Sequence, residues 1–104
     1  MAQDTHVQLY IGGKWRATSE TLAVINPANE DVIGSVAVAR EADLADATDA
    51  AWQGFKVWSQ TSPAARAAII LKAAQLLRER SEEIARSITL ENGKPISEAR
   101  LEVI

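Results

Sequence analysis

The stretch VIGSVAVAREADLADATDAAWQGFKVW, from Val32 to Trp58, decides the fold class because its hydrophobic period changes halfway along. Up to Val38 the residues alternate as in a β-strand, and one face of that strand holds Val32, Gly34, Val36 and Val38. Gly34 is expected to mark a β-bulge. From Glu41 onward, apolar residues recur at the 3.6-residue period of a helix, on a face formed by Leu44, Ala47, Ala51, Phe55 and Trp58. Strands followed by helices predict an α+β arrangement.

Upstream of this stretch the sequence predicts two successive β-hairpins. The run Leu9-Tyr10-Ile11 and a second run around Trp15 are separated by Gly12-Gly13, and glycine adopts the positive φ of a tight turn at little cost. A further run, residues 22–25, ends at Asn26-Pro27, where proline has no amide hydrogen for strand pairing. Residues 28–31 then form the turn that precedes the strand beginning at Val32.

Three to four helices are expected after the hairpins. Ser62-Pro63 is typical of a helix start, with the serine as cap and the proline in the first turn. The helix that follows is expected to break near Arg80, and Ser81 is predicted to cap the next one. That helix should end at Asn92-Gly93, because glycine favours the left-handed conformation at a helix C-terminus.

The last predicted helix, residues 96–104, follows Lys94-Pro95 and has an apolar stripe formed by Ile96, Ala99 and Val103. No glycine, proline or polar tail closes it, whereas a domain usually ends in polar, loosely held residues. Residues 1–104 are therefore expected to be a truncated segment of a larger domain. The stripe has no predicted partner in the chain, so we expect it to promote self-association or a homo-oligomer, since exposed apolar surface tends to acquire a neighbour.

The composition excludes several classes of protein. The 104 residues suffice for one small domain, and 47% hydrophobic with 24% charged residues is typical of a globular chain. A net charge of −3 gives no basic patch for nucleic acid. No apolar run approaches the roughly 20 residues of a membrane helix, and no signal peptide is visible. The absence of cysteine excludes disulfides and a thiol nucleophile within this chain. A cytoplasmic location fits these features best.

Two candidate sites for chemistry are better explained as structural features. His6, the single histidine, lies in a polar N-terminal arm that is expected to be mobile, and it cannot form a serine–histidine–carboxylate triad there. Gly12-Gly13 and Gly93 do not form the three-glycine fingerprint of a dinucleotide site. Lys94 is followed by Pro95, which offers no amide to a phosphate, so we interpret Lys94 as a solvated turn residue.

The remaining candidates are carboxylates and tryptophans. Glu98 and Glu102 lie four residues apart on one helix face, which on a chain this charged is predicted to be a solvated face rather than an acid–base pair. Glu91 differs because it stands beside the turn at residues 92–95, where a carboxylate can help to hold a cation with oxygen ligands. The three tryptophans are expected to pack in the core: Trp15, Trp52 and Trp58.

The order of these features resembles that of the aldehyde dehydrogenases. LYIGGKW (residues 9–15) resembles the opening strand of that family, and VINPANEDVIG (residues 24–34) resembles its Asn-Pro-turn-strand segment. Residues 66–80 are similar to its arginine- and leucine-rich helix. LENGKP (residues 90–95) matches its Glu/Asp-x-Gly-Lys-Pro turn, which Glu98-Ala99 continues. Within the family, residues 89–99 are most similar to succinate-semialdehyde dehydrogenases.

The resemblance implies that residues 1–104 are the N-terminal segment of an α/β cofactor-binding domain in a much longer enzyme. Such enzymes oxidise an aldehyde to a carboxylic acid with NAD or NADP. A cysteine thiolate attacks the aldehyde, a glutamate activates water and an asparagine helps to hold the oxyanion. All of these groups, and the segments that bind the dinucleotide, lie outside the matched stretch. We therefore expect the chain alone to bind no cofactor, to contain no catalytic residue and to be inactive.

The resemblance also implies part of a monovalent cation site. Family members use backbone carbonyls just before the Asn-Pro pair and a carboxylate before the Gly-Lys-Pro turn, which correspond here to Val24, Ile25 and Glu91. A further ligand would lie beyond Ile104, so the site is expected to be incomplete.

Two other interpretations stay open. The first is a naturally short, non-catalytic interaction module on the same scaffold, which a stop codon directly after Ile104 would favour. The second is a small, unrelated α+β binding domain, which requires the ordered motif matches to be coincidental. The sequence determines neither the aldehyde, nor the choice between NAD and NADP, nor the native oligomer.

Overall fold

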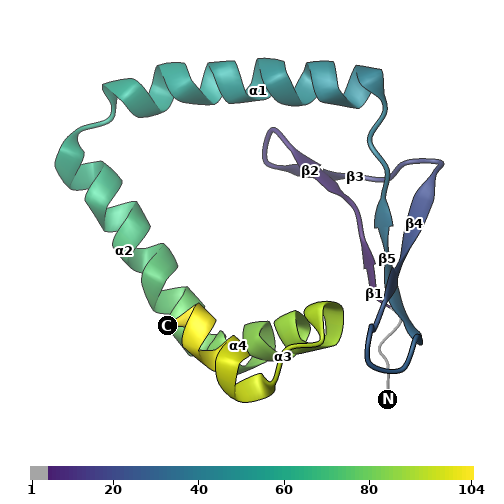
Figure 1. The fold of residues 1–104 in the computed structure, drawn as a ribbon. Coiled ribbons are helices and arrows are strands. Elements are labelled where there is room, and N and C mark those ends of the chain that lie inside the picture. Colours follow the sequence, from purple (N-terminus) through teal and green to yellow (C-terminus); the bar gives the residue numbers. More distant parts are fainter. Residues whose placement is uncertain (1–4) are drawn as a thin grey trace. The chain divides into compact units, whose positions relative to one another are not determined.

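The computed structural model describes residues 5–104, which form two compact units that we describe separately (Figure 1). The first unit holds the chain up to Val24 and from Val32 to Thr61, and the second holds Ile25–Asp31 and Ser62–Ile104. The α+β class is confirmed, because five short strands precede four helices. The strands are β1 (Thr5–Val7), β2 (Leu9–Ile11), β3 (Lys14–Arg16), β4 (Thr21–Ile25) and β5 (Val32–Ala37), and the helices are α1 (Glu41–Gln60), α2 (Pro63–Glu79), α3 (Ser81–Asn92) and α4 (Ile96–Val103).

The first predicted hairpin is confirmed. β2 and β3 pair antiparallel, with Tyr10 opposite Trp15, and the two rings lie 4.8 Å apart between centroids. Gly12 and Gly13 form the turn with φ values of 59° and 80°, a region that L side chains rarely adopt. The glycine pair therefore determines where the chain reverses.

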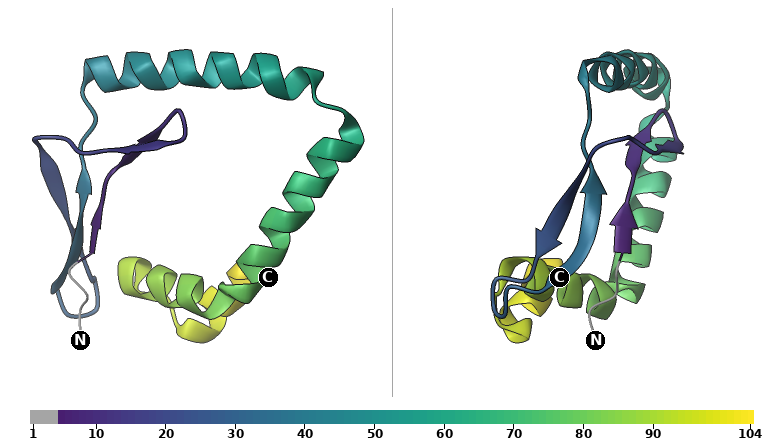
Figure 2. Two further views of the ribbon diagram at one scale, coloured as in Figure 1. Left: turned by 180° about the vertical axis from the view of Figure 1, so that it is seen from behind. Right: turned by 90° about the vertical axis from the view of Figure 1, so that its right-hand side faces the viewer.

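The second predicted hairpin is also present, but it belongs to a three-stranded sheet. β4 neighbours β5 across the loop at residues 26–31, and that loop is too short for a parallel crossover. On its other edge β5 pairs in parallel with β1, a strand that the sequence did not predict, in the register Thr5↔Gly34, His6↔Ser35 and Val7↔Val36. Figures 1 and 2 show β5 between its two neighbours.

The bulge expected at Gly34 is wrong. Gly34 is in register opposite Thr5, and a Cβ built on it would lie 2.4 Å from the Thr5 carbonyl oxygen. Glycine is required there because the backbone of β1 approaches closely, which is the other common role of glycine in a strand.

The polar contacts of Asp43 fix the start of α1. The Arg40 amide donates to the Asp43 carboxylate at 3.0 Å, and the Arg16 guanidinium on β3 donates to Asp43 at 3.0 Å and to Asp46 at 2.9 Å. The Arg40 amide, followed by Arg16, holds the pKa of the Asp43 carboxyl below its ordinary value. The same aspartate therefore caps α1 and ties it to the β2–β3 hairpin.

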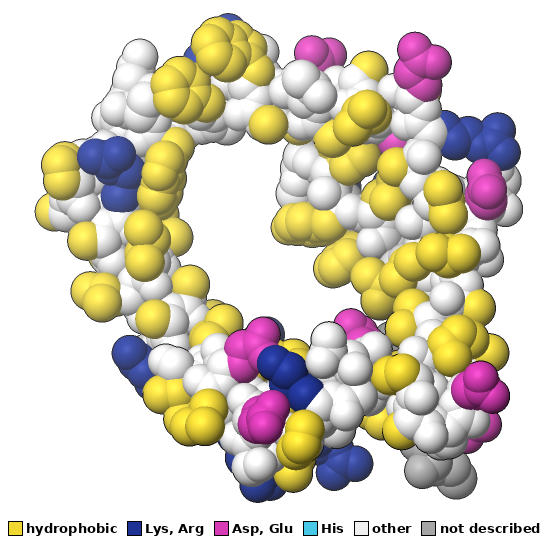
Figure 3. All heavy atoms as spheres, in the orientation of Figure 1, with side chains coloured by type: hydrophobic (Ala, Val, Ile, Leu, Met, Phe, Trp, Pro, Cys, Tyr) yellow, Lys and Arg dark blue, Asp and Glu magenta, His cyan; other side chains and the backbone are white. Residues whose placement is uncertain are grey.

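The helical face predicted for α1 is exposed within residues 5–104. Leu44 is 64% exposed, and Phe55 stacks on Trp52 at 5.5 Å between ring centroids while both stay open to solvent. Figure 3 shows hydrophobic side chains on the surface of α1 and, separately, on that of α2. The prediction that the tryptophans form a core is therefore wrong for this stretch of chain, because Trp15, Trp52 and Trp58 stay 65%, 57% and 38% exposed among the described residues.

Local helix signals in the second unit are mostly confirmed. The Ser62 hydroxyl accepts the Ala65 amide at 3.2 Å, with Pro63 in the first turn of α2. The predicted break occurs at Arg80, but the cap predicted at Ser81 is wrong. Arg80 is the residue between the two helices, and Ser81 already belongs to α3.

The core of the second unit lies between α3 and α4. Ala85 and Ala99 are fully buried and Val103 nearly so, and partly buried isoleucines pack on them: Ile84, Ile88 and Ile96. The expectation that the stripe on the last helix lacks a partner is therefore wrong, because α3 covers it. Small residues at the contact allow the two helices to approach closely.

Candidate functional site

The candidate site begins at the turn between β4 and β5. The Asn26 amide donates to the Asp31 carbonyl at 2.9 Å, and the Glu30 amide donates back to the Asn26 carbonyl at 2.8 Å. The Asn26 side chain accepts the Ala28 amide at 2.9 Å, and Asn29 accepts the Asp31 amide at 3.0 Å. Glu30 has a φ of 64°. These bonds make the turn a defined structure, as asparagine side chains often do by mimicking backbone turns.

The second part of the site is the C-terminal end of α3. The helix ends at Gly93, which has a φ of 83° and donates its amide to the Thr89 carbonyl at 2.9 Å. This left-handed residue confirms the predicted helix end. The chain then continues through Lys94 and Pro95 into α4, which begins at Ile96.

These two turns meet within the second unit. A Cβ built on Gly93 would lie 2.9 Å from Cγ of Pro27, which places the proline ring directly against the end of α3. The Asn-Pro and Gly-Lys-Pro motifs are more than sixty residues apart in the sequence, and this contact brings them together within the second unit.

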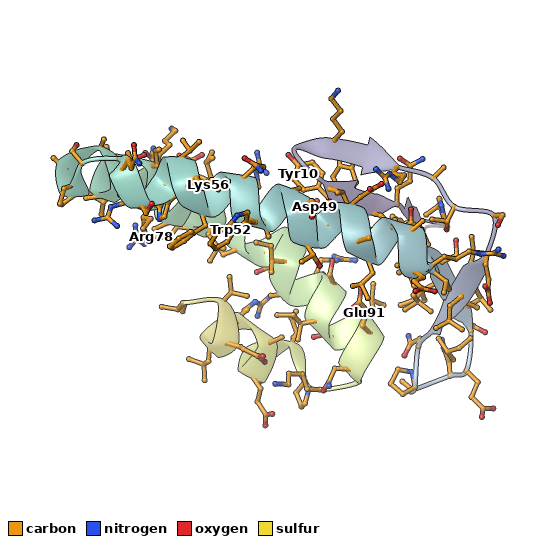
Figure 4. All side chains as sticks on the ribbon, turned by 90° about the horizontal axis from the view of Figure 1, so that it is seen from above. Tyr10, Asp49, Trp52, Lys56, Arg78 and Glu91 are labelled. Carbon is orange, nitrogen blue, oxygen red and sulfur yellow. The ribbon has the colours of Figure 1, made fainter. Side chains whose placement is uncertain are left out.

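The structure places the three predicted ligands as follows. Ile25 is the last residue of β4 and belongs to the second unit, as does Glu91 in the last turn of α3, which is labelled in Figure 4. Val24 belongs to the first unit, so it is described only through its covalent bond to Ile25. The Glu91 side chain is exposed and has no hydrogen-bond or ion-pair partner among residues 5–104. A carboxylate in this position is available to a cation.

The charges next to the site pair with each other. Lys94 forms an ion pair with Glu102 of α4, which raises the pKa of the lysine ammonium. Lys94 lies in the turn as interpreted and its side chain is 29% exposed. The sequence did not indicate its ion pair, because Lys94 precedes α4 while Glu102 lies in the last turn of that helix, eight positions further along. Glu102 is 54% exposed, in keeping with the solvated helix face predicted for it and Glu98.

His6 departs from its predicted role. It lies in β1, not in a mobile arm, and its Nδ1 is 2.8 Å from the Ser35 hydroxyl of β5. The partner was missed because Ser35 is 29 residues away in sequence. The pairing of β1 with β5 explains why His6 and Ser35 lie side by side. Among the described residues, no carboxylate is hydrogen-bonded to His6 to complete a catalytic triad.

A shallow cleft of about 260 Å³ lies between α3 and α4, lined by Glu82, Arg86, Thr89, Leu90, Ile96 and Arg100. Arg100 donates two hydrogen bonds to Glu82, at 2.9 and 2.7 Å, and this pairing lowers the pKa of the Glu82 carboxyl. The Thr89 hydroxyl is buried without a partner in the described part of the chain. With its one acid already paired, the cleft resembles a helix–helix groove more than a site for chemistry.

Residues 5–104 contain no group of three or more histidine, cysteine, aspartate or glutamate side chains arranged to hold a metal ion. Within the same range, no helix has both the length and the apolar character needed to cross a membrane.

Comparison with known proteins gives a consistent result. The model of the aldehyde dehydrogenase family matches residues 15–104. The chain is 43% identical to malonate-semialdehyde dehydrogenase of Bacillus pumilus, over 95% of this chain and 21% of that protein. It superposes on 1-pyrroline-5-carboxylate dehydrogenase of Thermus thermophilus with a TM-score of 0.94 and 38% identity, over 97% of this chain and 20% of that structure.

An NAD-dependent aldehyde dehydrogenase of Sinorhizobium meliloti gives a TM-score of 0.92 at 31% identity, over 98% of this chain and 21% of the other. The chain thus spans about a fifth of the length of the relatives that it matches.

Proposed function

This chain belongs to the aldehyde dehydrogenase family, and on that premise we propose that it is the N-terminal scaffold segment of an enzyme that oxidises an aldehyde to a carboxylic acid with NAD or NADP. The observation that supports this most strongly is the family match over residues 15–104 combined with coverage of only a fifth of each relative. The scaffold role follows because the matched stretch contains no cysteine to act as the nucleophile.

The dinucleotide does not fit this part of the enzyme. A dinucleotide site needs spaced glycines between a strand and a helix N-terminus. The glycines here lie in a hairpin turn, within β5, within α1 and at the end of α3, and none precedes a helix start after a strand. We therefore assign NAD or NADP binding to the remainder of the proposed enzyme and derive no catalytic step through it here.

For the aldehyde, we propose the semialdehyde of a short dicarboxylic acid. The support is the name of the Bacillus pumilus relative, a malonate-semialdehyde dehydrogenase. It differs in chain length from the succinate semialdehyde suggested by residues 89–99. Both candidates have a carboxylate at one end and an aldehyde at the other. Comparing the specificity constants for the two semialdehydes would distinguish them.

We propose that Ile25 and Glu91, with Val24, contribute to a monovalent cation site in that enzyme. The support is the chemistry of the donors. Carbonyl oxygens at the end of β4, and the Glu91 carboxylate without a partner among residues 5–104, are hard oxygen ligands of the kind that such cations take. In this position the cation would have a structural role within the second unit, holding Ile25 near the end of α3.

A cytoplasmic location and a homo-oligomer complete the proposal. Self-association no longer depends on the stripe of α4, which α3 covers, but on exposed apolar side chains elsewhere, such as Phe55 of α1 and Leu71 of α2. Light scattering over a concentration series would test it, and a monomer at every concentration would contradict it.

The central experiment compares the 104-residue chain with the full-length protein. When an aldehyde and NAD or NADP are added, the absorbance of the reduced nicotinamide should rise with the full-length protein but not with the 104-residue chain. Turnover by the pure 104-residue chain would contradict the scaffold role. Absence of turnover by a folded full-length protein with both semialdehydes and both cofactors would contradict the proposed activity.

A further inference from the structure

Gly93 is the point at which the Asn-Pro turn contacts the end of α3. A Cβ built on Gly93 would lie 2.9 Å from Cγ and 3.8 Å from Cβ of Pro27, and real Cβ contacts essentially never fall below 3.0 Å. The turn residues Ile25–Asp31 group with the helices of the second unit and not with the strands on either side of them. The proline ring therefore occupies the space that a side chain at position 93 would need.

The backbone of Gly93 gives a second, separate reason for glycine. Its φ of 83° and ψ of 5° are left-handed, and L residues with a side chain adopt that region at a cost. Gly13 in the hairpin turn offers a matched comparison. It has a φ of 80°, yet a Cβ built on it would meet nothing within 4 Å. The two glycines share a positive φ and differ in the contact with Pro27.

The turn on the other side of the contact cannot yield easily. Asn26 exchanges backbone hydrogen bonds with Asp31 and Glu30, and its side chain holds the Ala28 amide. To restore an ordinary contact of 3.4 Å, the proline would have to retreat by about 0.5 Å. Because the internal hydrogen bonds of residues 26–31 resist deformation, we expect a displacement of Pro27 to move Ile25 as well.

We propose that Gly93 is a positioning residue for the cation site. Without a side chain it lets Pro27 seat against the end of α3, and this contact sets the Ile25 carbonyl relative to the carboxylate of Glu91, two residues before the glycine. The inference rests on the cation site proposed above. In this proposal the geometry of the cation site depends on the contact between Pro27 and Gly93 as well as on the ligands themselves.

The test uses the full-length protein and four variants: Gly93→Ala, Gly13→Ala, Gly93→Ala combined with Pro27→Ala, and the ligand control Glu91→Gln. The melting temperature is measured in KCl and in choline chloride at equal ionic strength, and the potassium dependence gives an apparent dissociation constant. We expect Gly93→Ala to weaken potassium binding at least about tenfold and to melt several degrees below Gly13→Ala. The double variant should recover part of the lost melting temperature, because the clash with the ring is removed.

The outcomes separate this inference from the cation proposal. Equal melting temperatures for Gly93→Ala and Gly13→Ala would overturn the positioning role, as would unchanged potassium binding in Gly93→Ala. If the unmodified protein does not respond to potassium, the cation proposal fails and the positioning role toward it fails with it. A remaining difference between the two glycine variants would then show that the contact serves stability alone. Glu91→Gln provides the control for the ligand itself, since it should weaken potassium binding without a clash.

Discussion

Replacing Gly34 with alanine should unpair the first strand of the sheet. The added Cβ would lie 2.4 Å from the carbonyl oxygen of Thr5, 3.4 Å from its carbonyl carbon and 3.5 Å from its nitrogen. An ordinary contact of 3.4 Å requires the oxygen to retreat by about 1 Å, and it belongs to backbone and not to a flexible side chain. That displacement exceeds what the hydrogen bonds between β1 and β5 can absorb.

The expected magnitude follows from two effects. Overpacking of a tight contact costs about 1–3 kcal/mol, and each backbone hydrogen bond that is lost costs about 1 kcal/mol. Since β1 is only three residues long, it can detach and relieve the clash, which limits the total. We expect the free energy of unfolding to fall by about 2 kcal/mol, measured by urea denaturation of the full-length protein.

Gly54→Ala is the matched control for this experiment. Gly54 lies within α1, and a Cβ built on it would meet nothing within 4 Å. The same substitution should therefore stabilise the protein by up to about 1 kcal/mol through helix propensity. Amide hydrogen exchange at His6 and Val7 should accelerate in Gly34→Ala and not in Gly54→Ala. A Gly34→Ala variant with unchanged stability and unchanged exchange in β1 would refute the reasoning.

Two further predictions concern packing and pH. Ala99→Leu should lower the free energy of unfolding by about 1–3 kcal/mol, because Ala99 is fully buried between α3 and α4. Leu101→Ala, at a 74% exposed position, should change it by less than about 0.5 kcal/mol. Equal effects of the two substitutions in thermal denaturation would contradict the assigned core. Because the folded-state pKa of Asp43 is lowered, its contribution to stability is present above the unfolded value of 3.8 and is lost as the pH falls through the folded one. Urea midpoints between pH 2 and 7 should thus fall less steeply on acidification in Asp43→Asn than in the unmodified protein, and parallel profiles would contradict this assignment.

Features determined by neighbouring residues could be predicted from the sequence. The Gly12-Gly13 turn, the start at Ser62-Pro63 and the helix end at Gly93 each depend on the φ preference or hydrogen bonding of one or two residues. The cap at Ser81 was mispredicted because α2 and α3 are separated by Arg80 alone, which leaves no room for serine outside the helix.

Features that depend on distant partners could not be predicted in the same way. The hydrophobic period showed which side of α4 is apolar, but not that Ala85 of α3 covers it. β1 has three residues, and its residue types show no alternation that would predict a strand. The motif order indicated Ile25 and Glu91, whereas the contact of Pro27 with Gly93 depends on how segments far apart in the sequence pack.

The parallel pairing of β1 with β5 has a consequence for the order in which the chain assembles. Parallel neighbours cannot be joined by a tight turn, and His6 meets Ser35, which lies 29 positions further along the chain. The β2–β3 hairpin closes over two residues and can form within microseconds of its synthesis. β1 must wait until β5 has been translated. During synthesis β1 therefore has no partner in its sheet until β5 follows, and a ribosome paused before residue 35 would hold a nascent chain with β1 unpaired.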